Sequence, residues 1–164
     1  MHVLIATDGS EQALAAAKLV PAWLNLAAID RVTVLAIAPA ADPSSLYLGY
    51  DLDPMGGAAG AGALAMTDWE KLAAEVKRAG EVAAKRTAAV LAGLKAPVET
   101  VVRQGAPADE ILQAAEELHA DLIIMGSRGW GQLKAMLLGS ISEHVLHHAT
   151  CPVLIARATE EQGS

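Results

Sequence analysis

Glycine and hydroxyl residues in the C-terminal half have a spacing that suits the binding of an anion. Two residues separate Gly126 from Gly129, and nine further residues lead to Gly139 and Ser140, where a helix is expected to begin. Glycine lets backbone N–H groups turn inward, and the unpaired N–H groups at a helix start attract negative charge. The pattern predicts a loop that holds phosphate groups without a lysine. The alternative is that the glycines only form turns after a strand.

Two widespread phosphate-binding motifs are absent from the sequence. It contains no GxxxxGK[ST] segment, and no G-x-G-x-x-G segment follows the first predicted strand. That strand is followed instead by Thr7-Asp8-Gly9-Ser10. Asp8 is a candidate for ligand contact, and the alternative is that it only caps the following helix.

Five short runs rich in Val, Ile and Leu predict the strands that position these residues. The runs are nearly continuous rather than alternating, as in strands that are covered on both faces of a parallel sheet. They comprise residues 2–6, 32–38, 98–103, 121–125 and 152–157. The segments between them predict helices at residues 11–25, 68–94, 109–118 and 140–148.

Capping residues and a proline indicate where these helices begin and end. Ser10 precedes the first helix, and Pro21 is expected to kink or shorten its last turns. Asp68 is the expected N-cap of the long helix. Ser140 and Glu143 have the S-x-x-E spacing of a capping box.

Alternation of strands and helices predicts an α/β fold. We expect a single doubly wound domain with a five-stranded parallel sheet, order 3-2-1-4-5, and helices on both faces. The domain should span residues 1–158, with a long loop at 39–67 and a tail at 159–164. In this order a ligand crevice lies at the carboxyl ends of strands 1 and 4, where Asp8 and Gly126 are expected.

Composition excludes several classes of partner. The net charge of −7 opposes binding to nucleic acid, whose affinity depends on neutralising phosphates. The longest weakly polar stretch, residues 55–66, is much shorter than the ~20 apolar residues of a membrane helix, so no membrane partner is expected. The N-terminus lacks the features of a signal peptide, which predicts a cytoplasmic location. Cys151 is the only cysteine and is interpreted as a small buried apolar residue.

Several segments together resemble the universal stress protein family, in its ATP-binding branch. The resemblance covers nearly the whole chain. It rests on residues 7–10 (TDGS), 105–111 (GAPADEI), 120–129 (ADLIIMGSRG), 137–146 (LLGSISEHVL) and 151–154 (CPVL). The GxxG-x9-G[ST] pattern that marks nucleotide-binding members is complete here.

The resemblance implies a nucleotide site, ATP with Mg²⁺, and a role for each matching residue. Adenosine would contact Ala6, Thr7, Asp8 and Ile37, while Met125 and Gly126 would line the ribose side. The phosphates would be surrounded by Arg128, Gly129, Gly139, Ser140, Ile141 and Ser142. The sequence departs from the family at strand 2, where Ala36 replaces a common histidine and a long glycine-rich loop follows.

Nothing in the sequence assembles a catalytic site. Cys151 has no paired histidine nearby, and Ser127 has none at a predictable distance, so no catalytic residue is assigned. The histidines at 144, 147 and 148 share one helix, but no further zinc ligand converges on them, so no metal site is assigned. We therefore expect an ATP-binding regulatory protein of the stress response with at most slow ATP hydrolysis.

An interaction module without enzymatic activity is the alternative function. In this case the site would be empty, occupied by AMP, or purely structural. The last strand, residues 152–157, is apolar and lies at a sheet edge, which invites pairing with a second copy. The family resemblance also implies a homodimer formed in this way.

Overall fold

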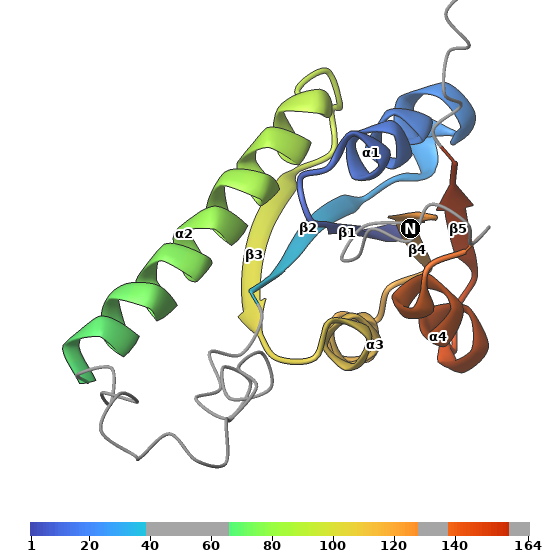
Figure 1. Ribbon diagram of the computed structural model, residues 1–164. Helices are drawn as coiled ribbons and strands as arrows, with labels where there is room; N and C mark the ends of the chain where they lie inside the picture. Colours follow the sequence, from blue (N-terminus) through green and yellow to red (C-terminus); the bar gives the residue numbers. More distant parts are fainter. Residues whose placement is uncertain (39–65, 128–137, 158–164) are drawn as a thin grey trace, which may run out of the picture.

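Five strands form one parallel sheet in the computed structural model, which describes residues 1–38, 66–127 and 138–157. The strand order is β3-β2-β1-β4-β5, as predicted from the sequence. Figure 1 shows the first strand in the middle of the sheet and the third and fifth at its edges. The strands are β1 (His2–Thr7), β2 (Arg31–Ala38), β3 (Val98–Gln104), β4 (Leu122–Gly126) and β5 (Val153–Ala156).

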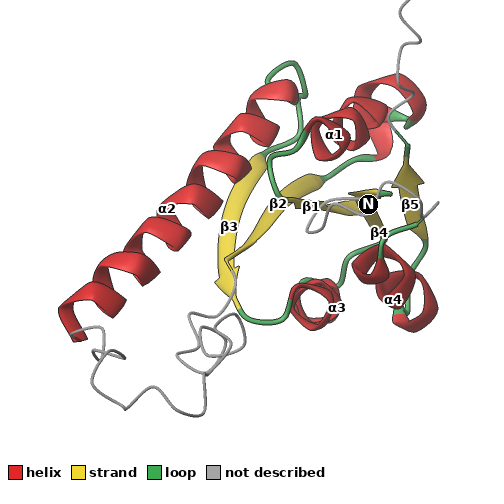
Figure 2. Cartoon of the chain, viewed as in Figure 1, coloured by secondary structure: helices red, strands yellow, loops and turns green. Residues whose placement is uncertain are grey.

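Helices cover both faces of this sheet (Figures 1 and 2). They are α1 (Glu11–Trp23), α2 (Met66–Val90), α3 (Pro107–Glu117) and α4 (Ser140–His148), with a short 3₁₀ turn at Leu26–Ala28. The first two lie on one face, and α3 and α4 lie on the other. The sequence prediction of an α/β fold with helices on both faces is confirmed.

Burial along the strands follows their position in the sheet. Every residue of β1 is buried, and so is every residue of β2 after Arg31. In contrast, the edge strand β3 has exposed or half-buried residues throughout, and β5 is half-buried except at Ala156. The continuous apolar runs thus predict burial on both faces correctly for the central strands, but not for the edge strands β3 and β5.

Two apolar clusters fill the layers on either side of the sheet. One packs α1 and α2 against strand residues that include Val3, Ile5 and Val34. The other packs α3 and α4 against the alternate residues, which include Leu4 and Leu35. Because side chains alternate along a strand, one buried strand serves both clusters.

Element ends differ from the sequence prediction at several points. The N-cap of α1 is Ser10, as expected, and its side chain accepts a hydrogen bond from the backbone N–H of Ala13. That helix continues through Pro21 to Trp23, two residues short of the predicted end. The predicted N-cap Asp68 is wrong, because α2 already begins at Met66. α3 begins at Pro107, whose ring fits the first helical turn, where no backbone N–H is needed.

Parts of the sequence prediction fall outside the described residues. The predicted loop 39–67 is one of them, except that Met66 and Thr67 belong to α2. The predicted tail 159–164 is another. Within the described ranges, no helix combines the length and apolar character needed to cross a membrane.

Candidate functional site at the ends of β1 and β4

The carboxyl ends of β1 and β4 are neighbours in the sheet. The two strands pair in parallel with Val3 opposite Leu122 and Ile5 opposite Ile124, a register that brings Thr7 level with Gly126. From β1 the chain proceeds to β2 on one side, and later returns to β4 on the other. Ligands of open α/β sheets bind where the strand order reverses in this way. The carboxyl-end edge of the sheet at β1 and β4 is therefore the candidate site.

Three of the apolar residues expected at the site lie on the same face of the sheet. Ala6, Ile37 and Met125 come from three adjacent strands and belong to the cluster beneath α3 and α4. Their exposed fractions are 1%, 4% and 0%. The structure therefore brings these residues together as a closed apolar floor, which could meet a ligand through backbone atoms and the small exposed part of Ile37.

The turn after β1 is shaped by its own polar side chains. Ser10 caps α1, and its backbone N–H donates a hydrogen bond to Asp8 Oδ1 at 3.0 Å. The alternative considered for Asp8, a cap of the following helix, is not what the structure shows, because Ser10 is the N-cap and Asp8 closes an Asx turn just before it. The second carboxylate oxygen of Asp8 has no hydrogen bond to a described residue and remains available to a ligand.

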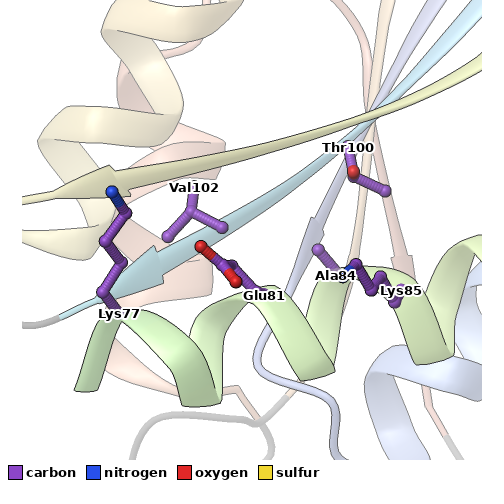
Figure 3. A pocket seen from close by; sticks show the side chains of 6 residues that line it. All are labelled: Lys77, Glu81, Ala84, Lys85, Thr100 and Val102. Atoms are coloured by element: carbon purple, nitrogen blue, oxygen red, sulfur yellow. The ribbon is translucent and has the colours of Figure 1, made fainter. Parts of the chain in front are cut away.

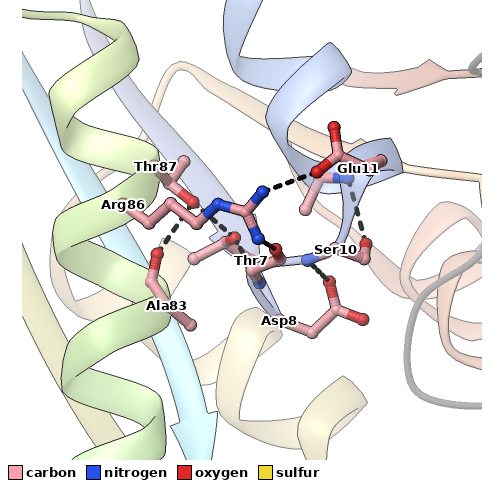
Figure 4. A network of polar contacts seen from close by, with 9 residues as sticks. Thr7, Asp8, Ser10, Glu11, Ala83, Arg86 and Thr87 are labelled. Atoms are coloured by element: carbon pink, nitrogen blue, oxygen red, sulfur yellow. Dashed lines mark hydrogen bonds and ion pairs between the residues drawn. The ribbon is translucent and has the colours of Figure 1, made fainter.

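A chain of hydrogen bonds ties this turn to α2 (Figure 4). The backbone N–H of Gly9 donates to Thr7 Oγ1 at 3.0 Å, and Thr7 Oγ1 lies 2.7 Å from Thr87 Oγ1. Thr87 Oγ1 in turn donates to the carbonyl oxygen of Ala83 at 2.9 Å. Because each hydroxyl has one proton, Thr7 donates to Thr87, and the bonds run in one direction from the turn into the helix.

Arg86 holds the same turn from its exposed side. Its guanidinium donates to the carbonyl oxygen of Gly9 at 3.1 Å and to Glu11 Oε1 at 2.6 Å. Gly9 has φ +76°, and a Cβ at this position would lie 2.9 Å from Ala83 Cβ. The turn therefore needs glycine both for its backbone conformation and for the close approach of α2.

Sequence analysis missed Arg86 and Thr87 as residues of this site. A signal for Thr87 was present, because it is a polar residue at helical spacing from the apolar Ala84 and Leu91. Nothing in the sequence indicates that its partner is Thr7.

The start of α4 lies against the end of β4. Gly139 N–H donates to the carbonyl oxygen of Ser127 at 2.8 Å, and Ser142 Oγ donates to that of Gly126 at 2.9 Å. Ser127 N–H itself donates to the carbonyl oxygen of Ala156 at 2.7 Å. These bonds fix the first turn of α4 to β4 and β5 at the same edge as the Thr7–Ser10 turn.

The expected capping box at the start of α4 is wrong. The N-cap is Gly139, no side chain caps the helix, and Ser140 is already the first helical residue. Among the described residues, none accepts a hydrogen bond from the backbone N–H of Ser140 or Ile141. Free donors at a helix start favour an anion, and no side chain in the described part of the chain competes for them.

Two of the residues expected around the phosphates, Arg128 and Gly129, lie outside the described residues. The other ten are described. Eight belong to β1, β2, β4 or the start of α4 (Ala6, Thr7, Ile37, Met125, Gly126, Ser140, Ile141 and Ser142), while Asp8 lies in the turn after β1 and Gly139 caps α4.

The histidines of α4 form a local arrangement away from this edge. The rings of His144 and His148 stack with centroids 4.2 Å apart, and His148 Nδ1 donates to the carbonyl oxygen of His144. In the described part of the chain, no group of three or more His, Cys, Asp or Glu side chains is placed to hold a metal ion. Cys151 is half-buried rather than fully buried, and loss of solvation raises the pKa of its thiol.

Comparisons with known proteins agree on one family. The sequence model described as the universal stress protein family matches residues 1–157. The universal stress protein MJ0531 of Methanocaldococcus jannaschii is 32% identical over 160 residues, which cover 98% of this chain and 84% of that protein.

Solved structures share the fold. The structure of protein MJ0577, also from Methanocaldococcus jannaschii, has a TM-score of 0.74 at 26% identity and covers 98% of this chain and 97% of its own. A universal stress protein family protein from Arabidopsis thaliana, solved with AMP bound, has a TM-score of 0.64 at 16% identity, with 100% and 95% of the two chains covered. With the sheet order, the matched length and these relatives in agreement, the chain belongs to the universal stress protein family.

Proposed function

We propose that the chain is an ATP-binding regulatory protein of the stress response, with the nucleotide at the carboxyl ends of β1 and β4. The observation that carries this proposal is the uncapped start of α4, fixed at the same sheet edge as the Thr7–Ser10 turn. An AMP-bound relative with the same fold adds support.

The proposed ligand is an adenine nucleotide with Mg²⁺, and each residue expected at the site has a role toward the nucleotide. The N–H groups of Ser140 and Ile141 would donate to phosphate oxygens, together with Arg128 and Gly129. The free oxygen of Asp8 would accept a hydrogen bond from the adenosine end, next to Ala6, Thr7 and Ile37. Met125 and Gly126 would line the ribose side, and Gly139 and Ser142 would support the phosphate loop. Bound ATP would supply a concentrated negative charge that biases loop order or partner binding.

Hydrolysis should be slow at this site. Among the described residues at the site, none forms a nucleophile and base pair, because the hydroxyls of Thr7 and Ser142 are bonded to Thr87 and to the carbonyl oxygen of Gly126. Such a site stabilises bound ATP more than the transition state, so we expect turnover well below about 1 per second. Purified protein that hydrolyses ATP faster than this would contradict the regulatory role.

The test is to identify nucleotide released from purified protein and to titrate ATP calorimetrically with and without Mg²⁺. Asp8→Asn keeps an oxygen for the Ser10 N–H but replaces the free acceptor by a donor, so it should weaken binding without unfolding the turn. Gly129→Val should abolish phosphate binding, while Gly93→Val, at an open position, is the matched control. Failure of the folded wild type to bind any adenine nucleotide would overturn the proposal.

We also propose a homodimer formed through β5, because its edge is apolar. Val153, Leu154 and Ile155 are only half-buried in the single chain, and the strand lies at the end of the sheet. Val153→Glu should give monomers in light scattering, while Val82→Glu on the exposed face of α2 should leave the mass unchanged. A dimer that binds no nucleotide would instead favour a pure interaction module.

A further inference from the structure

A groove runs along the outer edge of the sheet, between β3 and the overhanging α2 (Figure 3). Its volume is about 410 Å³. Thr100 and Val102 of β3 form its floor, and α2 contributes Lys77, Glu81 and Lys85 with Ala84. None of the residues proposed to bind nucleotide takes part in it.

The three charged residues lie on one flank of α2 because they are spaced four apart. Residues at this spacing are neighbours on a helix surface, so Lys77, Glu81 and Lys85 form a row. Ala83 and Arg86 lie on the opposite flank, where they contact the turn after β1. The helix thus has one flank directed toward the centre of the sheet and another directed beyond β3.

The charges of this row have no partners among the described residues. None of the three side chains makes an ion pair or a hydrogen bond there. The neighbouring edge strand is also incomplete, since β3 pairs with β2 on one side and with no described strand on the other. Such an edge presents backbone N–H and C=O groups to any added strand.

The spacing of the row matches the spacing of side chains on an extended strand. Four residues of helix span about 6 Å, and two residues of strand span about 6.6 Å, which is the distance between side chains on one face. A strand added beside β3 would place alternate side chains beneath Lys77, Glu81 and Lys85 in turn. The complementary order is acidic, basic, acidic at every second position.

We propose that this edge binds an extended segment of a partner protein with the alternating pattern acidic-x-basic-x-acidic. Backbone pairing with β3 would supply sequence-independent affinity, and the row on α2 would select the charge pattern. In Figure 3 the Lys77 side chain extends toward the carboxyl end of β3, so the row begins near the end of the strand.

A second copy of this chain is a poorer occupant. Thr100 and Val102 face α2, so alternation places Val98 and Gln104 on the same side. None of these four residues is charged. A second β3 added at this edge with the same face toward α2 would therefore leave the row without opposite charges.

Binding of labelled peptides by fluorescence anisotropy tests the proposal. The probe peptide places glutamate, lysine and glutamate at every second position, separated by valine and threonine. A second peptide carries lysine, glutamate and lysine at these positions, and a third is the probe with alternate backbone amides methylated. The full-length protein should bind the first peptide, with affinity falling at high salt and on methylation.

Charge reversal provides the decisive comparison. The double variant Lys77→Glu/Lys85→Glu should bind the probe peptide at least about tenfold more weakly. The triple variant Lys77→Glu/Glu81→Lys/Lys85→Glu should exchange preference and bind the inverted peptide. Lys18→Glu, an exposed lysine on α1, changes the net charge by the same amount as the triple variant and should bind like wild type.

Three results would overturn the inference. The first is no wild-type binding of the probe at about 1 mM, which is weaker than a specific contact of this size. The second is equal binding of both charge patterns by wild type and the triple variant, since the row would then select nothing. The third is a change in native mass on reversal of the lysines, which would make the groove a contact between copies. These peptide-binding measurements do not depend on nucleotide binding at the carboxyl ends of β1 and β4. Failure of the proposed function would therefore leave them unchanged.

Discussion

Thr7 and Thr87 are both fully buried, and their hydroxyl oxygens lie 2.7 Å apart. The first residue ends the central strand β1, and the second lies near the end of α2. Their contact links the turn proposed to hold adenosine with the helix that overhangs β3. A substitution at Thr87 therefore tests whether this contact positions the turn.

Replacement of Thr87 by valine tests this link. The variant keeps the side-chain volume but removes the hydroxyl that accepts from Thr7 and donates to Ala83. We expect a loss of about 1–3 kcal/mol in the free energy of unfolding, because a buried hydroxyl is left without its partner. Urea denaturation measures it, with the exposed Thr100→Val as a control that should change by less than about 0.5 kcal/mol.

Nucleotide titration of the same Thr87→Val variant tells whether the substitution disturbs only the turn after β1 or the whole fold. If the hydroxyl chain positions the turn, ATP affinity should fall while binding of the probe peptide at β3 is kept. Equal stability of the variant and wild type would show that the threonine contact contributes nothing.

Gly9→Ala should destabilise the protein for two separable reasons. The residue has φ +76°, and its new Cβ would lie 2.9 Å from Ala83 Cβ. We expect a loss of about 1–3 kcal/mol in thermal or urea unfolding. Ala83→Gly removes the Cβ that is contacted, and a double-mutant cycle that includes the Ala83→Gly single variant separates this contact from the backbone strain and from the cost of glycine inside a helix.

Gly93→Ala is the matched control for this experiment. Apart from its chain neighbours, no atom lies within 4 Å of the point that its new Cβ would occupy, and its φ is ordinary. The substitution should leave stability unchanged or raise it slightly. A coupling energy in the cycle of Gly9→Ala with Ala83→Gly that equals the whole loss in Gly9→Ala would mean that the backbone conformation of Gly9 carries no strain.

Acid titration should reveal the ion pair at the end of α3. The guanidinium of Arg103, followed by the amide of Gln113, donates hydrogen bonds to Glu117 and lowers the pKa of its carboxyl below the ordinary 4.5. Since the folded pKa is the lower one, this pair contributes stability above about pH 4.5, and the contribution is lost as pH falls through the lowered value.

Carboxyl NMR checks this prediction directly. Arg103→Gln should return the pKa of Glu117 toward its ordinary value, with the remaining lowering due to Gln113. Arg78→Gln, an exposed change on α2, should leave the titration unaltered. An unchanged Glu117 titration in Arg103→Gln would show that the pair does not persist in solution.

Alkylation of Cys151 should be slow at neutral pH. Burial raises the pKa of this thiol above its ordinary 9.0, so the folded protein holds less reactive thiolate than the unfolded chain. The raised pKa also means that stability declines as pH rises from about 9.0 through the folded value. Iodoacetamide labelling followed by mass spectrometry, with and without urea, gives the comparison. Equal rates in both states would contradict it.

The sheet and its order could be predicted because the signals are local and strong. Buried parallel strands such as β1 and β2 have nearly continuous runs of Val, Ile, Leu and Ala, and the right-handedness of the crossover connections leaves few ways to arrange them. The Ser10 cap was predictable for the same reason, since a serine before an apolar-periodic segment has one favourable local bond to make.

The contacts that shape the site were less predictable because they depend on packing between distant segments. A Gly-Ser pair does not specify which residue becomes the N-cap, and the structure assigns Gly139 rather than Ser140. Likewise, the sequence shows Thr87 only as one polar residue in an alanine-rich helix. Its role follows only from the packing of α2 against the end of β1 and the turn after it, which no local pattern encodes.

The central position of β1 bears on the order in which the protein can be completed during synthesis. β1 pairs first with β2, which follows within the same quarter of the chain, and then with β4, whose Leu122 is made far later. The half that contains α1, β2, α2 and β3 can therefore assemble on a growing chain before β4 leaves the ribosome. The carboxyl-end site shared by β1 and β4 is formed among the last, so an incomplete chain would expose the α3-facing side of β1 and would lack the site that is proposed to bind nucleotide.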